Sequence, residues 1–339
     1  MEKVSFVIPV RNEEEVLPEL HRRLDAVAAQ IAGQCEFILV DDGSTDRTRE
    51  VLGELRGRDQ RMKLLFLARN FGHQLAITAG LDFASGDAVV IIDGDLQDPP
   101  EVVLEMLPLW REGYEVVSAV RRRRAGESRM KLWAAHTFYR VMRRLSNVDF
   151  PVDTGDFRLV DRRVADVVRG MREPDRYLRG MFSWVGFRQT GVEYARDQRY
   201  AGQTKNSWRQ MISFAIDGLL GFSVAPLRFI LGLGFVISFL SLAWGVVAIM
   251  VKLTGSVPPG GQGWASLTVL ITFLAGVQLI VLGMMGLYVA RAYEQGKNRP
   301  LYLVASAEGL EAGPSGPLRE GSVLGAERQP AESGFHASE

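Results

Sequence analysis

Short apolar runs alternate with amphipathic segments along the first 120 residues of the chain. The runs are rich in β-branched side chains and predict buried strands at Val4–Val10, Glu36–Val40, Lys63–Leu67, Ala88–Ile92 and Val116–Val120. Between them, apolar residues three and four positions apart predict helices, the first from an N-cap at Asn12 to about Ile31. Strands that alternate with helices are typical of βαβ units. The pattern therefore predicts an α/β fold with a mostly parallel, doubly wound sheet.

Two much longer apolar segments follow in the second half of the chain, Phe229–Val251 and Trp264–Ala290. They contain 23 and 27 residues without a charge, and about 20 apolar residues suffice to cross the core of a bilayer. Basic residues flank the outer ends of this pair at Arg228, Arg291, Lys297 and Arg299, against Lys252 alone between the segments. The pattern predicts two transmembrane helices with both termini in the cytoplasm.

The chain is therefore expected to comprise six regions. A cytoplasmic α/β domain occupies residues 1–205, and an interfacial amphipathic helix occupies 206–226. The first membrane span is at 227–252, a short extracytoplasmic loop at 253–263 and the second span at 264–291. A cytoplasmic tail at 292–339 is expected to be mostly disordered, because Gly, Ser, Glu and Pro dominate it after about Ala305.

Composition adds limits on the partners of the chain. Lys and Arg together number 40, as do Asp and Glu, so no global field favours nucleic acid, and no nucleic-acid partner is expected. Cys35 is the only cysteine, which excludes an internal disulfide. Nine basic residues interleaved with aromatic and aliphatic ones crowd into residues 121–144. This segment is typical of a membrane surface, with a solvated helix face as the alternative.

Acidic residues follow three of the predicted strands, at the edge where ligands bind in an open parallel sheet. These residues and one amide beyond them are Glu13, Asp41, Asp42, Asp93, Asp95 and Gln97. Paired carboxylates repel unless a cation lies between them, and such oxygen ligands suit Mg²⁺ or Mn²⁺ on a diphosphate. A polar turn that caps the following helix is the alternative. The chain lacks G-x-G-x-x-G after its first strand and lacks G-K-S/T, so neither hydride transfer nor P-loop chemistry is supported.

Five spaced blocks resemble a known family. They are SFVIPVRNEE at 5–14, LVDDGSTD at 39–46, RNFGHQ at 69–74, DGDLQDPP at 93–100 and DTGDFR at 153–158. Together they resemble inverting family-2 glycosyltransferases with the GT-A fold. The two C-terminal spans narrow the resemblance to bacterial polyisoprenyl-phosphate glycosyltransferases, which are related to dolichyl-phosphate mannose synthase and to the bactoprenol glucosyltransferases of O-antigen modification. The likeness covers residues 4 to about 300.

The resemblance implies roles for individual residues. Nucleotide contacts are implied for Pro9, Arg11, Glu13, Asp41, Asp42 and Asp93, although the family usually has an aromatic residue where Arg11 stands. Asp93, Asp95 and Gln97 would hold Mg²⁺ or Mn²⁺, and Arg121, Arg129, Arg199 and Lys205 would bind the diphosphate or the acceptor. Asp95 and Asp156 are the implied catalytic residues, and Asp156 either orients the acceptor or serves as a base. His73, which lacks a His or Cys neighbour, is interpreted as a helix-start contact.

The implied function is inverting, metal-dependent transfer of a hexose from UDP-glucose to undecaprenyl phosphate for cell-envelope glycan modification. Other donors, namely GDP-mannose, UDP-N-acetylhexosamine and UDP-aminoarabinose, stay open, as does a non-catalytic membrane-anchored sugar-nucleotide-binding protein. A processive polysaccharide synthase is disfavoured because no Gln-x-x-Arg-Trp block is present. The expected location is the bacterial inner membrane, with multiple spans and the catalytic domain facing the cytoplasm. A homo-oligomer, dimer or tetramer, is left open.

Overall fold

The computed structural model describes residues 2–122, 154–174, 176–196 and 263–310, with scattered helical positions between 232 and 250. The predicted interfacial helix at 206–226 and most of the first span and of the basic segment lie outside these residues. The chain forms two compact units. The first comprises residues 1–128, 150–205 and 300–339, and the second comprises 129–149 and 206–299.

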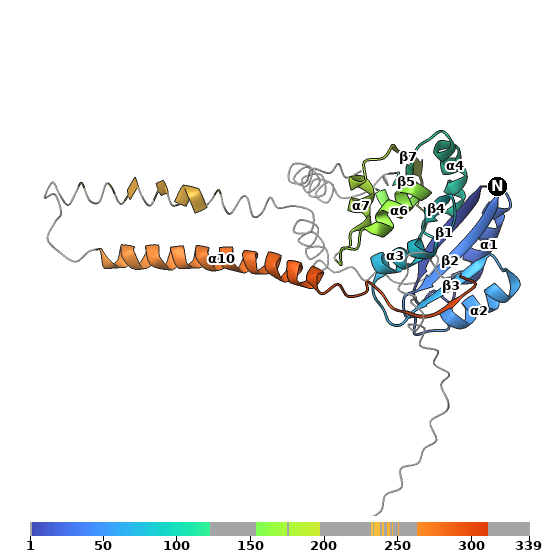
Figure 1. Cartoon of the computed structure of the whole chain (residues 1–339), viewed down its shortest axis with the longest axis horizontal. Coiled ribbons are helices and arrows are strands. Elements are labelled where there is room, and N and C mark those ends of the chain that lie inside the picture. The colour runs from blue at the N-terminus through green and yellow to red at the C-terminus, as the bar shows by residue number, and fades with distance from the viewer. Residues whose placement is uncertain are drawn as a thin grey trace, which may run out of the picture. The chain divides into compact units, whose positions relative to one another are not determined.

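The first unit contains an eight-stranded sheet with helices on both faces (Figure 1). Its strands are β1 (Lys3–Val10), β2 (Gln34–Asp41), β3 (Met62–Leu67), β4 (Ala88–Ile91), β5 (Val116–Arg121), β6 (Thr154–Asp161), β7 (Gln189–Tyr194) and β8 (Val304–Glu308). Its helices are α1 (Leu17–Ala28), α2 (Thr48–Arg58), α3 (His73–Phe83), the 3-10 helix η1 (Pro100–Val102), α4 (Val103–Arg111), α6 (Arg162–Gly170) and α7 (Leu178–Trp184). The second unit contributes α10 (Trp264–Gly296).

The strand order is β7-β5-β6-β4-β1-β2-β3-β8. Six strands share one direction, and β6 and β8 run antiparallel to their neighbours. The predicted mostly parallel α/β sheet is confirmed, and each of the five predicted strands is present to within two residues of its expected bounds. β6 was not predicted. It lies between β4 and β5 in the sheet, so two strands that follow each other in the prediction are not neighbours.

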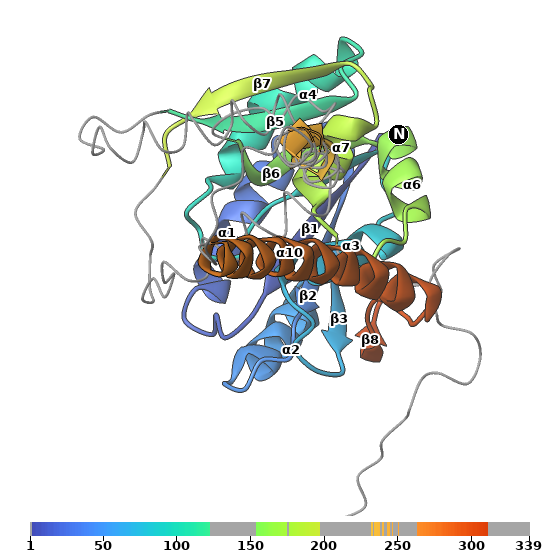
Figure 2. The same ribbon diagram turned by 90° about the vertical axis from the view of Figure 1, so that its left-hand side faces the viewer.

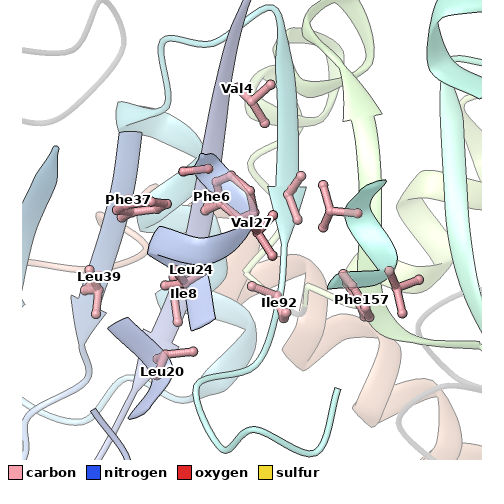
Figure 3. Packing of buried hydrophobic residues seen from close by; sticks show 14 of the residues in the cluster. Val4, Phe6, Ile8, Leu20, Leu24, Val27, Phe37, Leu39, Ile92 and Phe157 are labelled. Atoms are coloured by element: carbon pink, nitrogen blue, oxygen red, sulfur yellow. The ribbon is translucent and has the colours of Figure 1, made fainter. Parts of the chain in front are cut away.

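The core explains why the predicted strands are nearly continuous apolar runs. Phe6 and Ile8 of β1 pack with Leu20 and Leu24 of α1 on one face of the sheet (Figure 3). Val7, which lies between them in β1, belongs to the cluster on the opposite face together with residues of α3, α6 and α7. Because both faces of the sheet are covered, side chains that alternate in direction are all buried.

The C-terminal part of the first unit contains an ordered strand, β8, where a disordered tail was predicted. β8 pairs antiparallel with β3, with Leu64 opposite Glu308 and Leu67 opposite Val304 (Figure 2). Just before β8, Tyr302 is 1% exposed. The prediction of disorder after about Ala305 is therefore wrong for residues 305–310, which the structure describes. The sequence of this edge strand, Val-Ala-Ser-Ala-Glu, does not by itself predict a strand, since the order of these five residues depends on pairing with β3.

α10 coincides with the second predicted membrane span and extends to Gly296, past the expected end at residue 291. Apolar side chains along it, such as Leu279, Ile280 and Val289, are at least 66% exposed. Within the described residues, one helical segment, Phe273–Gly296, is long and apolar enough to cross a membrane, with a mean hydropathy of 2.0. The other span, at 227–252, lies mostly outside the described residues and stays a prediction.

A buried polar cluster surrounds Glu36 of β2, whose side chain is 3% exposed. Its carboxylate accepts hydrogen bonds from the hydroxyls of Ser5 and Ser85. It also accepts from Lys63 Nζ at 2.6 Å, and Lys3 Nζ lies 2.8 Å away. Burial raises the pKa of Glu36, but the hydrogen bonds from these residues outweigh burial and lower the pKa to about 2. The ion cluster therefore stabilises the ionised carboxylate inside the fold.

We expect Glu36→Gln to lower the free energy of unfolding by about 3 kcal/mol at pH 7, the equivalent of a shift from 4.5 to about 2. Because the folded-state pKa is depressed, this contribution is present above pH 4.5 and is lost as the pH falls toward 2. Urea unfolding of both proteins between pH 2 and pH 7 measures it. A difference in stability that stayed constant over this range would contradict the expectation.

Candidate active site

The carboxyl ends of β1, β2 and β4 meet at one edge of the sheet, because these three parallel strands are neighbours. The turn after β4 lies so close to β1 that a Cβ on Gly94 would be 2.7 Å from Val10 Cγ1 and 3.1 Å from the carbonyl oxygen of Pro9. Any larger residue would push the turn away from β1. Glycine at this position therefore keeps the segment from Asp93 to Asp95 against the end of β1.

The loops after β1 and β2 are joined by Asn12. Its φ of 55° lies in the left-handed region, and its side-chain oxygen accepts from the backbone N–H of Thr45 at 2.8 Å. Its own N–H donates to Ser44 Oγ at 2.9 Å. The prediction that Asn12 caps the first helix is wrong, because α1 begins only at Leu17. The residue instead uses its hydrogen-bonding capacity to hold two loops of the site together.

The three residues implied on the β1 side occupy different positions. Pro9 lies in β1, in register with Val40. Arg11 is exposed beyond the strand, and the backbone N–H of Glu13 donates to Thr48 Oγ1 at 2.9 Å. All three therefore lie at the carboxyl end of β1, and the nucleotide contacts that the resemblance implies for them stay a prediction.

Asp41 and Asp42 are both buried where β2 ends. Asp41 accepts from Arg49 Nε at 2.8 Å and from a backbone N–H of its own loop. Asp42 accepts from the backbone N–H groups of Phe71 at 2.7 Å and Gly72 at 2.9 Å. Burial raises the pKa of Asp42, against these hydrogen bonds. Asp42 thus holds the segment that leads into α3.

Asp93 follows β4 with one oxygen, Oδ1, that is inaccessible to solvent and has no hydrogen-bond partner in the part of the chain that the structure describes. Burial raises the pKa of Asp93 to about 6, and the charges of Asp156, Asp98 and Asp95 add to this effect while His73 opposes it. The imidazole of His73 lies 3.3 Å from this oxygen, but other carboxylates also surround it, so a metal cation here would relieve both desolvation and repulsion.

The residues after Asp93 fit such a cation. Asp95 Oδ1 accepts from the Gln97 backbone N–H at 3.1 Å. Between them, Leu96 has a φ of 58°, and a left-handed non-glycine residue costs about 1–3 kcal/mol, as strained residues at functional sites often do. Among the described residues, no three His, Cys, Asp or Glu side chains form a metal cluster. Asp93 and Asp95 supply two carboxylates, and Mg²⁺ is commonly bound by one or two carboxylates together with water and substrate oxygens.

β6 delivers Asp156 to the same edge. β4 and β6 are antiparallel with Ile91 opposite Arg158, and this register continued by two residues puts Asp93 opposite Asp156. His73, the first residue of α3, bridges the two carboxylates, with Nε2 at 3.3 Å from Asp93 Oδ1 and 3.3 Å from Asp156 Oδ2. Burial lowers the pKa of His73, but both carboxylates outweigh it and raise the pKa. His73 is therefore a link between the two acids.

Asp156 is 7% exposed and accepts on both oxygens. Arg179 Nε donates to Oδ1 at 2.8 Å and Nη2 donates to Oδ2 at 3.1 Å. Gln74 Nε2 donates to Oδ2 at 3.3 Å, while its own oxygen accepts from the Leu178 N–H at 3.0 Å. Burial raises the pKa of Asp156, but the contacts with His73 and Arg179 outweigh it and hold the pKa well below its ordinary value. The group is an anion at neutral pH.

Asp98 organises the other side of the site. It is fully buried, and the Tyr194 hydroxyl donates to its Oδ1. Arg121 Nη2 lies 3.7 Å from Oδ2, and Arg196 Nε lies 3.4 Å from Oδ1. Arg121 Nε also donates to the Tyr194 hydroxyl at 3.2 Å. The buried carboxylate of Asp98 therefore lies close to two arginines, Arg121 from β5 and Arg196 from the residues after β7.

The structure brings most of the expected site residues to one edge of the sheet. Arg129, Arg199 and Lys205 lie outside the described residues. Asp98, Gln74 and Arg179 were not predicted as site residues, nor was the link that His73 makes between two carboxylates. The blocks at 69–74 and 93–100 contained three of these residues, whereas Arg179 had no local signal.

Comparison with known proteins gives consistent matches. Residues 5–169 match the profile of the family described as glycosyl transferase family 2. The glycosyltransferase YkcC of Bacillus subtilis (strain 168) is 45% identical over 308 residues, which cover 91% of this chain and 94% of that protein. The bactoprenol glucosyl transferase of Shigella phage SfV is 37% identical over 303 residues, covering 89% and 98%. The structure of the Pyrobaculum calidifontis mannosyltransferase PcManGT in complex with GDP-Man and Mn²⁺ gives a TM-score of 0.48 at 18% identity, covering 88% of each chain.

Proposed function

This chain belongs to glycosyltransferase family 2, and we propose that it transfers glucose from UDP-glucose to undecaprenyl phosphate with inversion at the anomeric carbon. The observation that carries the proposal is the pair Asp93 and Asp95, with one buried oxygen of Asp93 that has no hydrogen-bond partner among the described residues, at the sheet edge that also carries the loops after β1 and β2. The relatives named bactoprenol glucosyl transferase support glucose as the transferred sugar and a lipid as the acceptor. The apolar segment of α10 supports a membrane location.

In this proposal the acids after β4 serve the donor diphosphate. Asp93, Asp95 and Gln97 hold Mg²⁺ or Mn²⁺, which when bound neutralises charge on the leaving diphosphate. The nucleotide lies along Pro9, Arg11, Glu13, Asp41 and Asp42. The two aspartates at the end of β2 already accept hydrogen bonds from the protein, so their proposed contribution is mainly to shape the loops that contact the nucleotide.

The proposed reaction needs little acid–base chemistry. The acceptor is a phosphate monoester and is already an anion near neutral pH, so its oxygen attacks the anomeric carbon without prior deprotonation. That bond forms as the bond from the same carbon to the diphosphate breaks, and the nucleoside diphosphate leaves with the electron pair. The chain must position two anionic substrates and offset their repulsion. Arg121, Arg129, Arg199 and Lys205 are the proposed cations for this task.

The proposed setting is the inner membrane of a bacterium, with several spans and with the catalytic unit on the cytoplasmic side, where nucleotide sugars are available. The lipid-linked glucose would serve cell-envelope glycan modification.

Incubation of the detergent-solubilised chain with radiolabelled UDP-glucose and undecaprenyl phosphate tests the proposal. Label is expected in an acid-labile lipid, dependent on added Mg²⁺ or Mn²⁺ and abolished by EDTA. UDP-N-acetylhexosamine, UDP-aminoarabinose and GDP-mannose are tested in parallel, since transfer from one of these alone would replace the proposed donor. If no donor labels the lipid fraction although nucleotide binds, the proposed transfer to lipid is wrong.

A further inference from the structure

We propose that Arg179 binds the phosphate group of the acceptor and that Asp156 is a positioning residue that holds this arginine in place. The inference rests on the proposed transfer to a phosphate-bearing acceptor, and it adds to that reaction a residue that the sequence motifs did not single out. It also replaces the role of general base that the resemblance left open for Asp156.

Within the part of the chain that the structure describes, the guanidinium of Arg179 is held along one edge. Its Nε and Nη2 donate to the two oxygens of Asp156 in a bidentate pair, at 2.8 and 3.1 Å. Asp156 is buried, whereas 38% of the Arg179 side chain is exposed. A guanidinium carries five N–H donors in a rigid fork, so the edge away from Asp156 retains donors. A half-exposed arginine anchored by a buried carboxylate presents those donors in a fixed direction.

A row of side chains of alternating charge connects Arg179, through Asp156, to the predicted metal ligand Asp93. The row runs from Asp93 to His73, Asp156 and Arg179, with both His73 contacts at 3.3 Å. The cationic end of the row therefore lies near the proposed diphosphate site. Two phosphate-bearing substrates repel each other, and a fixed positive charge at this position would offset that repulsion.

Arg121 lies against the residue of β6 that precedes Asp156. A Cβ on Gly155 would lie 2.7 Å from Arg121 Nη2, and Arg179 pairs with the following residue, Asp156. Burial and the charge of Arg179 both lower the pKa of Arg121, and contacts with Tyr194 and Asp98 outweigh them and raise it. Because neighbouring residues of a strand point to opposite faces of the sheet, Arg121 and the Asp156–Arg179 pair approach β6 from different faces. The single guanidinium of Arg179 suffices for the proposed contact, because a guanidinium can donate two parallel hydrogen bonds to a phosphate group.

The same contacts argue against Asp156 as a base. Its oxygens accept from Arg179 on both sides, and Oδ2 also accepts from Gln74 and lies beside His73. A carboxylate whose oxygens are occupied by cationic donors is poorly placed to take a proton from a substrate. The acceptor phosphate, moreover, has no proton that must be removed before attack.

Steady-state kinetics of the full-length wild-type chain and of Arg179→Gln test the inference, with undecaprenyl phosphate and the nucleotide sugar varied separately. Arg179→Gln is expected to raise the KM for undecaprenyl phosphate about 10- to 100-fold and to leave the KM for the nucleotide sugar within twofold. Arg179→Lys, which keeps the charge but loses the fork, should recover part of the loss. An unchanged acceptor KM, or a donor KM raised as much as the acceptor KM, would overturn the assignment.

A double-mutant cycle tests the role of Asp156. If Asp156 acts through Arg179, Asp156→Asn should add less than about threefold to the loss in kcat/KM for the acceptor once Arg179→Gln is present. If Asp156 is a base, the same substitution should cost a further 10²–10⁴-fold in either background, and that result would overturn the positioning role. Failure of the wild-type chain to glycosylate the lipid with any donor would instead overturn the proposed function itself.

Arg172 offers a matched control for loss of folding. It is 36% exposed and pairs with a fully buried aspartate, Asp82, at 2.8 Å, so it resembles Arg179 in burial and pairing. Asp82 lies nine residues after His73 on α3, about 14 Å along the helix. Arg172→Gln should lower the unfolding temperature at least as much as Arg179→Gln but leave the acceptor KM unchanged. A raised acceptor KM in this control would assign the Arg179 effect to destabilisation and overturn the inference.

Discussion

Replacing Asp93 with asparagine is expected to abolish transfer and, at the same time, to stabilise the metal-free protein at neutral pH. In the proposed site Asp93 is a ligand of the metal that neutralises the leaving diphosphate. Loss of that ligand should lower kcat/KM about 10³-fold or more, because charge stabilisation of this kind contributes several kcal/mol to the transition state. Transfer of label to lipid measures the loss.

The gain in stability follows from the raised pKa of Asp93. The carboxyl titrates at about pH 6 in the folded chain, against an ordinary value of 3.8, so at pH 7 its charge is less favourable in the folded than in the unfolded state. Asparagine removes that charge and should raise the free energy of unfolding by about 1–3 kcal/mol. The difference should shrink as the pH falls through 6 toward 4, where Asp93 is protonated and neutral in the folded state.

Asp95→Asn is the matched control two residues away. Asp95 Oδ1 accepts a backbone hydrogen bond from Gln97, and the amide oxygen of asparagine can replace this acceptor. The control should therefore lose transfer without gaining stability. Thermal unfolding of all three proteins in EDTA, at pH 4.5 and pH 7, separates the two effects. An Asp93→Asn protein no more stable than wild type at pH 7 would show that the charge of Asp93 does not strain the metal-free site.

Removal of the C-terminal segment that contains Tyr302 and β8 is expected to destabilise the catalytic unit severely, although this segment is far from the candidate site in sequence. The Tyr302 hydroxyl donates to Asp82 Oδ2 at 2.7 Å, and the Leu303 carbonyl accepts from the Ala68 N–H at 2.9 Å. Tyr302→Ala alone should lower the free energy of unfolding by about 3–5 kcal/mol, because it leaves a cavity and an unmet acceptor in the interior. A stop codon at Pro300, which removes the whole segment, should lower the free energy of unfolding further.

Two variants separate the contributions. Tyr302→Phe keeps the packing and loses the hydroxyl, so it should cost about 1–2 kcal/mol, with Arg172 still paired to Asp82. A stop codon after Leu310 keeps β8, and it should be neutral if the prediction of a disordered tail holds for 311–339. Denaturant unfolding followed by tryptophan fluorescence measures each variant. A deletion from Pro300 that unfolds like the wild-type chain would contradict a structural role for the segment.

The local signals in the sequence were sufficient for the central strands and for the acids that follow them. Val4–Val10 and Ala88–Ile92 are mostly apolar and rich in β-branched residues because each strand is buried on both faces. A run of a few such residues is enough to predict a buried strand. The acids at Asp93 and Asp95 were identified from their position after such a strand. The family resemblance then assigned the chemistry, and the matches to known proteins confirm the family.

What only the tertiary structure decided depends on contacts between residues far apart in the chain. β6 pairs with β4 across about 70 residues and so sets Asp156 opposite Asp93, and β8 reaches β3 across some 240 residues. Neither register has a signature in hydrophobic periodicity, because periodicity reports which face of an element is buried and not which partner covers it. The role of Arg179 likewise could not be predicted from the sequence, since nothing near it in the sequence distinguishes it from other surface arginines. Its place beside Asp156 depends on how α7 packs against the sheet.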